Sequence, residues 1–330
     1  MKRRPPLRES RLVQVAVGAT MLAVPALVSS HDASAVEQPT TGQSGSQSSV
    51  EATIRSHRVP FGRDLVVIGL APAADVGQTL VLQYAPAGSG EWQELTSTTV
   101  GDNGRFRLTA PVTSSGLARV AGPSPGSPSP TVPVALAASN SSTTVTVPQR
   151  VEVAAAIRVP SRAINVLGTE TISVRGRLLP AATDRRVKLQ ARLGGRWVTL
   201  AVARTGPRGR FHLRYLAGKL GQEKLRVRFA GDSSNAPAVG RAGVLTVYHQ
   251  TSASWYEDGG STACGFHAYY GVANLSLPCG AKVSFAYGGR TVTAVVDDRG
   301  PYVDGRVWDL NQNTAAALGL AGVQAVWSSS

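Results

Sequence analysis

The feature that most limits the fold of this chain is an internal repeat of about a hundred residues. In the first copy, Trp92 is followed by Gly104-Arg105-Phe106, and in the second, Trp197 is followed by Gly209-Arg210-Phe211. The same 12-residue spacing separates the tryptophan from the glycine in both copies. Two copies of one pattern predict two modules with the same fold, placed in tandem.

Each copy consists of short β-prone runs that end at Gly, Pro, Asn or Asp. Residues 171–175 and 211–215 of the second copy alternate between apolar and polar side chains. Short alternating runs with frequent turn residues favour a β-sandwich. The modules loosely resemble the immunoglobulin-like repeats of bacterial surface proteins, although they lack a cysteine pair. We expect the two tryptophans to pack in the cores of the sandwiches.

The first 35 residues have the pattern of a secretory signal. Five basic residues surround the start of an apolar run from Leu12 to Val28, and Ala33-Ser34-Ala35 fits a small-residue cleavage site. An uncleaved membrane anchor is the alternative, but Pro25 and the short, alanine-rich run argue against it. We therefore expect a protein of the cell wall or the extracellular space, with no membrane span after signal cleavage.

Changes in composition divide the chain into segments. Residues 36–50 are rich in Gln, Ser, Thr and Gly, which is typical of a flexible linker. Prolines crowd the end of the first module, and a Ser/Thr/Asn-rich stretch follows them. The predicted segments are a signal peptide at 1–35, a linker at 36–50, a sandwich at 51–138, a linker at 139–150, a basic sandwich at 151–248 and a C-terminal domain at 250–330.

The positive charge of the chain is concentrated in the second module. Residues 151–250 hold 18 basic and 5 acidic residues, whereas residues 36–150 hold 7 of each and residues 251–330 hold 4 basic and 6 acidic. One basic module in a secreted protein indicates an anionic surface as its partner, such as wall teichoic polymers or acidic glycan. The alternative is that the arginines only solvate strand faces. We expect no nucleic-acid partner.

The sequence has two cysteines, Cys264 and Cys279. In an exported protein a disulfide is the default for such a pair. A reactive thiol is the alternative function. Two cysteines without clustered histidines are poor evidence for zinc, and nothing in the sequence indicates another metal or a cofactor.

Two adjacent acids end a β-prone run near the C-terminus. The apolar residues 292–296 lead into Asp297 and Asp298, and Arg299-Gly300-Pro301 follows them. Glycine tolerates positive φ and proline fixes φ, so a rigid turn is expected here. Such a turn aims Asp298 at a cleft. The alternative is that Asp298 only starts the turn, where aspartate is common.

Four motifs in this part of the chain resemble those of the rare lipoprotein A (RlpA-like) family, in the family's order. They are Ala253-Ser254-Trp255-Tyr256, Thr262-Ala263-Cys264-Gly265, Leu277-Pro278-Cys279-Gly280 with Lys282-Val283, and Asp298-Arg299-Gly300-Pro301-Tyr302 with Gly305-Arg306 and Asp309-Leu310-Asn311. The resemblance covers residues 252–327, about the last quarter of the chain. It implies a six-stranded double-psi β-barrel, related to the barrels of expansins and of membrane-bound lytic transglycosylase A. The whole chain is then all-β, with two sandwiches before the barrel.

Local patterns add detail to the expected barrel. Gly288-Gly289 is a hairpin turn signal. Asn311 or Asn313 caps a short helix that runs to Leu318 and ends at Gly319. Alternation over residues 323–327 predicts a closing strand.

The resemblance also implies a chemistry, the lytic cleavage of peptidoglycan glycan strands, which makes the enzyme a lyase. An acid protonates the glycosidic oxygen, and the sugar's own 6-hydroxyl then attacks the anomeric carbon to give a 1,6-anhydro product. One carboxyl serves first as acid and then as base, unlike the carboxyl pair of ordinary glycoside hydrolysis. Asp298 matches the family's essential acid. Asp309 matches a second family acid and is the weaker candidate, with a bond to the backbone or to Arg306 as its alternative role. Asp297 raises the proton affinity of its neighbour if both face the cleft.

The sequence departs from the family at two positions. Phe266 stands where lytic members have a glutamate, and Asn274 stands where the family has a histidine. If the barrel is catalytic, His267 or Glu257 takes over the role of the missing glutamate or histidine. The alternative for His267 is a packing or surface role. Aromatic rings of Trp255, Tyr269 and Tyr270 are further candidates to line a sugar groove. The candidate substrate-binding residues are Tyr256, His267, Asn274, Arg299, Tyr302 and Arg306.

Three hypotheses remain open at this point. The barrel is a lytic transglycosylase acting through Asp298, a non-catalytic, expansin-like glycan-binding module, or a passive cap on two adhesive sandwiches.

Overall fold

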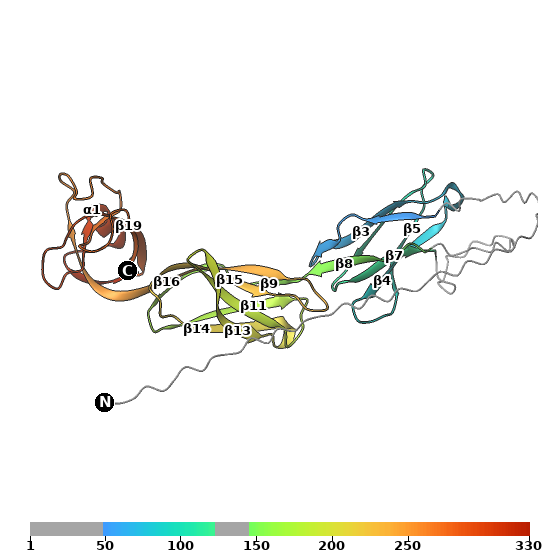
Figure 1. Cartoon of the computed structure of the whole chain (residues 1–330), viewed down its shortest axis with the longest axis horizontal. Coiled ribbons are helices and arrows are strands. Elements are labelled where there is room, and N and C mark those ends of the chain that lie inside the picture. Colours follow the sequence, from blue (N-terminus) through green and yellow to red (C-terminus); the bar gives the residue numbers. More distant parts are fainter. Residues whose placement is uncertain (1–48, 123–144) are drawn as a thin grey trace, which may run out of the picture. The chain divides into compact units, whose positions relative to one another are not determined.

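The computed structural model describes residues 49–122 and 145–330 (Figure 1). The predicted signal peptide, most of the first linker and the proline-rich end of the first module lie outside these residues. Within the described ranges the regular structure is β-strand, apart from one α-helix and two 3-10 turns, Ala73–Asp75 and Pro207–Gly209. No helix in those ranges has the length and apolar character needed to cross a membrane.

The first module is a sandwich of two sheets. One sheet has the order β1-β3-β6 and the other β2-β8-β7-β4-β5. Leu65 and Leu108 of the first sheet pack against Leu82 and Val120 of the second in one buried cluster. The strands are β1 (Glu51–Ile54), β2 (Arg58–Pro60), β3 (Asp64–Leu70), β4 (Thr79–Pro86), β5 (Gln93–Thr99), β6 (Arg105–Pro111), β7 (Gly116–Ala121) and β8 (Gln149–Ala154).

β8 extends the first sandwich beyond the segment assigned to it from composition. Residues 149–154 were divided between the linker and the second repeat, yet β8 pairs antiparallel with β7 and parallel with β2. Val151 and Val153 of β8 are fully buried in the first core. The domain limits as such stay a prediction, as does the immunoglobulin-like assignment.

The second module repeats the architecture with its own core. A sheet of order β14-β11-β9 faces a sheet in which β13, β12, β15 and β16 are neighbours and β10 pairs with β16. Ile172 and Leu213 of the first sheet pack against Leu189 and Val227 of the second. The strands are β9 (Ala156–Arg158), β10 (Arg162–Leu167), β11 (Thr171–Leu179), β12 (Arg186–Leu193), β13 (Arg196–Arg204), β14 (Arg210–Leu216), β15 (Gly221–Phe229) and β16 (Ala238–Tyr256).

A glycine and a phenylalanine have the same packing in both modules, which supports the sequence repeat. Gly69 lies opposite Phe106, and Gly176 lies opposite Phe211. A Cβ on Gly69 would be 2.3 Å from the Phe106 ring, and one on Gly176 would be 2.5 Å from the Phe211 ring. The ring therefore occupies the space that the missing side chain leaves free.

The prediction that the two tryptophans pack in the sandwich cores is wrong. Trp92 and Trp197 are half-buried and belong to neither core cluster. The guanidinium of Arg119 lies 4.0 Å from the Trp92 ring centroid, and that of Arg226 lies 3.9 Å from the Trp197 ring centroid. Each arginine is thus held in a cation–π contact on the sheet surface.

A glutamine fixes each of these arginines from the other side. Nε of Arg119 donates to Oε1 of Gln83 at 2.8 Å, and Nε of Arg226 donates to Oε1 of Gln190 at 2.9 Å. The leucine-glutamine pair that precedes each tryptophan in the sequence therefore contributes one core residue and one residue that positions an arginine.

A single strand joins the second sandwich to the C-terminal domain. β16 pairs with β10 as far as Tyr248 and with β15 as far as Val247, and from His249 onward it pairs with β21 (Gln324–Ser328). The Tyr248 ring is 1% exposed, and its centroid lies 6.1 Å from that of Trp327. The two domains therefore share a hydrogen-bonded strand without an intervening loop.

The C-terminal domain is a closed ring of six strands. Around the ring the order is β16, β20, β17, β19, β18 and β21, and the β16–β21 pairing closes it. Phe285 and Trp308 meet edge-to-face in the barrel core, with ring centroids 5.1 Å apart. The remaining elements are β17 (Gly271–Ala273), β18 (Lys282–Tyr287), β19 (Arg290–Asp298), β20 (Trp308–Asn311) and α1 (Gln312–Leu318).

The predicted ends of the short helix are confirmed. Asn311 is the N-cap of α1, and its side chain accepts a hydrogen bond from the Thr314 amide. Gly319 ends the helix with φ of 72°, a left-handed conformation that glycine adopts without strain. The Nδ2 group of Asn311 donates to Oδ2 of Asp258 at 3.0 Å, so the same residue also holds the end of β16.

Candidate active site at the end of strand β19

The two adjacent carboxylates at the end of β19 have different environments. Asp297 is 1% exposed, and both of its oxygens accept backbone hydrogen bonds, from Val272 at 3.1 Å and from Ala268 at 2.8 Å. Its carboxylate fills the space beside Gly271, where a Cβ would lie 2.3 Å from Oδ2. Asp297 therefore ties β19 to the segment that leads into β17.

An effect of Asp297 on its neighbour was expected only if both acids face the cleft. Successive side chains of a strand point to opposite faces, and the buried Asp297 carboxylate is bound by backbone amides on its own side. Burial raises the pKa of Asp297, backbone hydrogen bonds oppose that shift, and the negative charge of Asp258 adds a smaller increase.

Asp298 is held through one carboxylate oxygen. Oδ1 accepts hydrogen bonds from the amides of Ala263 at 2.7 Å and Arg299 at 2.8 Å. Within the described residues Oδ2 has no hydrogen-bond partner, and the side chain is half-buried. An acid fixed at one oxygen and open at the other has the form that a proton donor to a bound molecule requires.

A disulfide joins the two loops beside Asp298. Cys264 and Cys279 are bonded, with 5.7 Å between their Cα atoms, which confirms the predicted pairing. The amide of Cys264 donates to the Asp297 carbonyl at 3.3 Å, so the first loop lies against the end of β19. Asp298 is therefore held between two cross-linked loops.

Arg299 fastens the second loop. Its Nη1 donates to the Asn274 carbonyl at 3.0 Å, and its Nη2 lies 3.1 Å from Sγ of Cys279. The guanidinium therefore bonds to groups of the loop beside Asp298.

A second carboxylate lies in the same row across the sheet. Ala273 of β17 is opposite Asp298 on one side and Asp309 on the other. Two strand spacings separate the backbones of the two acids, or about 10 Å. Oδ1 of Asp309 accepts a hydrogen bond from Oγ of Ser254 at 2.8 Å.

The protonation of Asp309 is shifted by its surroundings. Burial raises the pKa of Asp309, the Ser254 hydrogen bond and the charge of Arg306 lower it, and the charge of Asp298 raises it further. The influence of Asp298 shows that the two acids belong to one electrostatic site, and Arg306 acts on that site through its charge.

Tyr256 lies among the acids. Burial raises the pKa of its phenol, and the charges of Asp297, Asp298, Asp258 and Asp309 add to the increase. The hydroxyl is buried and has no hydrogen-bond partner among the described residues. The phenol is therefore a neutral donor near four carboxylates, with its hydrogen bond unused.

Exposed aromatic rings surround this part of the barrel. Tyr302 is 80% exposed, and its ring atoms come within 3.9 Å of the position that a Cβ on Gly300 would take, next to the Cβ of Ala273. Tyr302 thus stands beside the row that carries both acids. Trp255, Phe266, Tyr269 and Tyr270 are also exposed, and the rings of Tyr269 and Tyr270 meet edge-to-face at 4.9 Å.

The two positions that differ from the family motif have contrasting roles. Asn274 is 6% exposed, and its Oδ1 accepts from the amides of Ser276 at 3.1 Å and Leu277 at 2.9 Å. Its Nδ2 donates to the Val307 carbonyl at 3.2 Å, so the amide organises the loop. Phe266 and His267 are exposed, and Thr262 donates to the Phe266 carbonyl.

Sequence reasoning did not single out Ser254, Asp258 or the cap Asn311 as parts of the site. Ser254 precedes Trp255 in a motif that was recognised, and its alternation with the buried Ala253 places it on the outer face, toward Asp309. Asp258 could not be found from local pattern, because its partner Asn311 is distant in sequence. Within the described residues no group of three or more His, Cys, Asp or Glu side chains is arranged to hold a metal ion.

Residues 248–326 match the family described as "Lytic transglycolase". The C-terminal domain belongs to the RlpA-like double-psi β-barrel family. The matched range runs from the middle of β16 into the closing strand of the RlpA-like barrel, so it includes part or all of each of the six strands and the row that holds Asp298 and Asp309. No curated protein sequence matches the chain significantly.

Among the solved structures to which the chain is similar is one entitled "Biofilm associated protein - BSP domain", with 15% identity and a TM-score of 0.20. That similarity covers 60% of this chain and 29% of the other chain. A TM-score this low carries no argument about fold or function. The RlpA-like barrel and its disulfide fit an extracellular protein.

Proposed function

We propose that the RlpA-like barrel cleaves peptidoglycan glycan strands as a lytic transglycosylase, with Asp298 as acid and base. The observation that carries this proposal is the asymmetric hold on Asp298, whose Oδ1 accepts two backbone hydrogen bonds while Oδ2 is free among the described residues. A catalytic acid has to be rigid and must also present one oxygen to the substrate, and this arrangement meets both needs.

In this reaction Asp298 first donates a proton and then accepts one. Protonated Oδ2 donates to the glycosidic oxygen as the bond from the anomeric carbon to that oxygen breaks. The carboxylate then accepts the proton of the sugar's 6-hydroxyl, whose oxygen bonds to the anomeric carbon and closes the 1,6-anhydro ring. The acid is regenerated and no water is consumed, so the second carboxyl of a hydrolase is not required.

Neighbouring groups complete the site around Asp298. Asp309 lies across Ala273 from Asp298, and the charge of Asp298 helps to raise the pKa of Asp309. Tyr256 places a neutral phenol among the acids, and Tyr302 presents a ring on which a sugar face can stack. His267 and Arg306 stay candidate contacts to the glycan, whereas Arg299 and Asn274 support the loop beside it.

A specific observation favours a second function, that of a non-catalytic, expansin-like glycan-binding module. Phe266 is an exposed ring where lytic members have a carboxyl, and the amide of Asn274 is occupied by loop hydrogen bonds where the family has a histidine. Both changes remove a group that could transfer a proton, and the exposed Phe266 ring provides an apolar surface that suits sugar binding.

A digest of purified peptidoglycan separates the two functions. Substrates with and without stem peptides are treated with the mature chain or with Asp298→Asn, and mass spectrometry measures 1,6-anhydro ends. Release by the wild type and its loss in the variant are expected. If neither protein releases anhydro products while both pull down glycan, the catalytic proposal is rejected and the binding module stands.

For the chain as a whole, we propose secretion to the cell wall, with the second module holding an anionic wall polymer. Its excess of basic over acidic residues, 18 against 5 over residues 151–250, supports that partner.

A further inference from the structure

The outer face of the sheet β14-β11-β9 carries a row of arginines. Arg177 of β11 lies directly opposite Arg210 of β14 on one side and Arg158 of β9 on the other. Two positions away on β11, Arg175 lies opposite His212. Like charges placed directly opposite destabilise a sheet, so an arrangement of this kind calls for a compensating role.

The first sandwich supplies an internal comparison, because its strands have the same register. The row that corresponds to Arg158, Arg177 and Arg210 consists of Glu51, Leu70 and Arg105. Ile68 takes the place of Arg175. The equivalent sheet of the first module therefore forms with one arginine in this row, whereas the second module has three.

These cations have no acidic partners nearby. The salt bridges among the described residues are Arg185–Asp232 and Arg204–Asp184. Among the described residues Arg204 of β13 is thus paired, and that pair is exposed. Arg158, Arg175, Arg177 and Arg210 are exposed and form no ion pair in the part of the chain that the structure describes.

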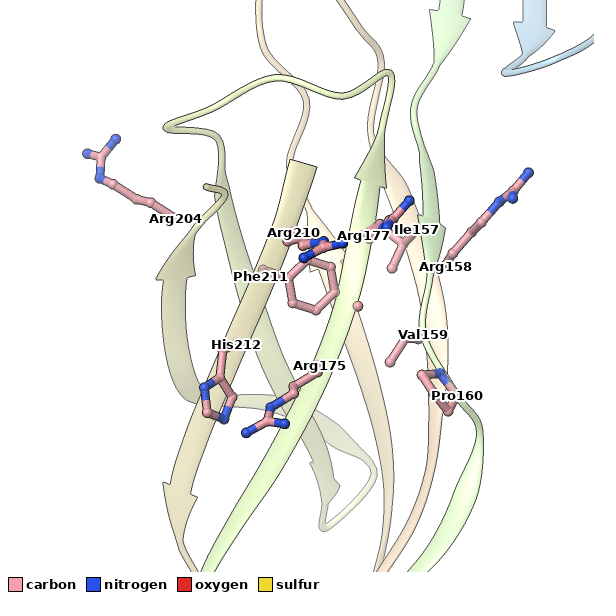
Figure 2. Close-up of a pocket in the computed structure, with 11 residues that line it drawn as sticks. Ile157, Arg158, Val159, Pro160, Arg175, Arg177, Arg204, Arg210, Phe211 and His212 are labelled. Carbon is pink, nitrogen blue, oxygen red and sulfur yellow. The ribbon is translucent and has the colours of Figure 1, made fainter. Parts of the chain in front are cut away.

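The arginines line a groove of about 1060 Å³ that contains no acidic residue. Figure 2 shows the side chains of Arg177 and Arg210 near the Phe211 ring and Arg175 beside His212, while Arg158 and Arg204 extend outward on either side. The floor is apolar, because Gly176 leaves the Phe211 ring in place next to Ile157 and Val159. The site combines an apolar floor with cations around it.

We propose that this groove binds a linear polyanion of the wall, in which phosphodiester or uronate groups repeat along an otherwise neutral chain. Guanidinium groups pair with phosphate and carboxylate oxygens in a bidentate manner, and here all fixed positive charges are arginine. The backbones of neighbouring strands stand about 5 Å apart, so the long arginine side chains that they carry can contact successive groups of one polymer. The inference rests on the anionic partner proposed above for the second module and is independent of the chemistry of the barrel.

The test replaces two groove arginines by the residues of the first module. Arg175→Ile with Arg177→Leu introduces the side chains found at Ile68 and Leu70, which are exposed there and compatible with the sheet. The matched control is Arg192→Ile with Arg196→Leu, which removes the same charge from exposed positions outside the groove. Circular dichroism checks that each mature chain is folded.

Binding is measured by fluorescence anisotropy with labelled polyphosphate, polygalacturonate and single-stranded DNA of matched charge, at several salt concentrations. The groove variant is expected to bind polyphosphate or polygalacturonate at least tenfold more weakly than the wild type. The slope of log affinity against log salt should fall by about 1.5, since two contacts are lost. The control is expected to stay within about twofold of the wild type, and the polymer bound more tightly identifies the anionic group.

The other outcomes reject defined parts of the inference. If the wild type binds no polymer at low salt, the anionic partner of the module is rejected. If it binds and the groove and control variants weaken equally, the groove is rejected and general surface charge accounts for binding. If single-stranded DNA binds at least tenfold more tightly than both other polymers, the wall polymer is rejected as the ligand.

Discussion

Replacing each of the adjacent acids by asparagine should separate a structural carboxylate from a catalytic one. In Asp297 the two oxygens accept hydrogen bonds from two different amides, those of Val272 and Ala268. Asparagine keeps one acceptor and turns an NH₂ group toward the other amide. In Asp298 both hydrogen bonds go to Oδ1, so asparagine retains both and alters only the free position.

The hydrogen bonds allow the magnitude to be worked out. A hydrogen bond to a charged group contributes about 1.5–3 kcal/mol, and a buried amide left unpaired adds a further cost. Burial disfavours the charge of Asp297, as its raised pKa indicates, and removing that charge offsets part of the loss. We expect Asp297→Asn to destabilise the barrel by about 2 kcal/mol, which is about 30-fold in an equilibrium constant. Asp298→Asn should cost less than about 1 kcal/mol.

Hydrogen exchange read by mass spectrometry on peptides from β19 measures this difference within the intact mature chain. Asp297→Asn should lower protection over residues 292–296 by about 30-fold and, at a temperature where it is folded, keep its activity on peptidoglycan. Asp298→Asn should change protection by less than about fivefold and abolish activity. Equal losses of protection, or loss of activity in folded Asp297→Asn alone, would show that the roles of the two acids have been assigned wrongly.

Three further predictions follow from the same structure. The pKa values of Asp297 and Asp309 are raised in the folded barrel, so the folded state binds more protons than the unfolded state at pH values above the ordinary aspartate pKa of about 3.9. The free energy of unfolding should therefore fall as the pH rises from about 3.9 through the raised pKa values. Urea unfolding of Asp309→Asn should show a smaller fall over the same pH range. Cys264→Ser with Cys279→Ser opens a loop with a sequence separation of 15 and should cost about 3 kcal/mol in urea unfolding, with an unchanged midpoint contradicting the loop-closure argument. Gly176→Ala places a methyl group 2.5 Å from the Phe211 ring and should lower the free energy of unfolding by about 1–3 kcal/mol, measured by thermal unfolding. Gly218→Ala, with no atom within 4 Å of its Cβ, should leave it nearly unchanged in that assay.

The parts of the fold that could be predicted from the sequence depend on local chemistry. The helix from Gln312 to Leu318 has its start and end encoded in Asn311 and Gly319. The disulfide follows from two cysteines in a chain with an export pattern, and the ring of strands follows from the family motifs. In each case the residues that decide the outcome are adjacent in sequence or belong to a known pattern.

The parts that could not be predicted depend on partners far along the chain. Trp92 was expected in a core because it is large and apolar, yet Arg119 provides a cation–π partner that holds it on the sheet surface. The different roles of Asp297 and Asp298 depend on amides of Ala268, Val272 and Ala263, which only the folded barrel brings to β19. The arginine row likewise needs the register of three strands, because Arg158, Arg177 and Arg210 are not spaced regularly in the sequence.

Strand β16 makes the second sandwich and the barrel mechanically dependent on each other. Its residues before Tyr248 complete the sandwich sheet, and those from His249 onward complete the barrel ring. If the sandwich holds a polymer, as proposed above, a force on that polymer would be transmitted to the barrel along β16 and its backbone hydrogen bonds, because no flexible linker separates the two domains. That force would then act directly on the ring of strands that holds Asp298. A flexible insertion between Tyr248 and His249 would uncouple the sandwich from the barrel.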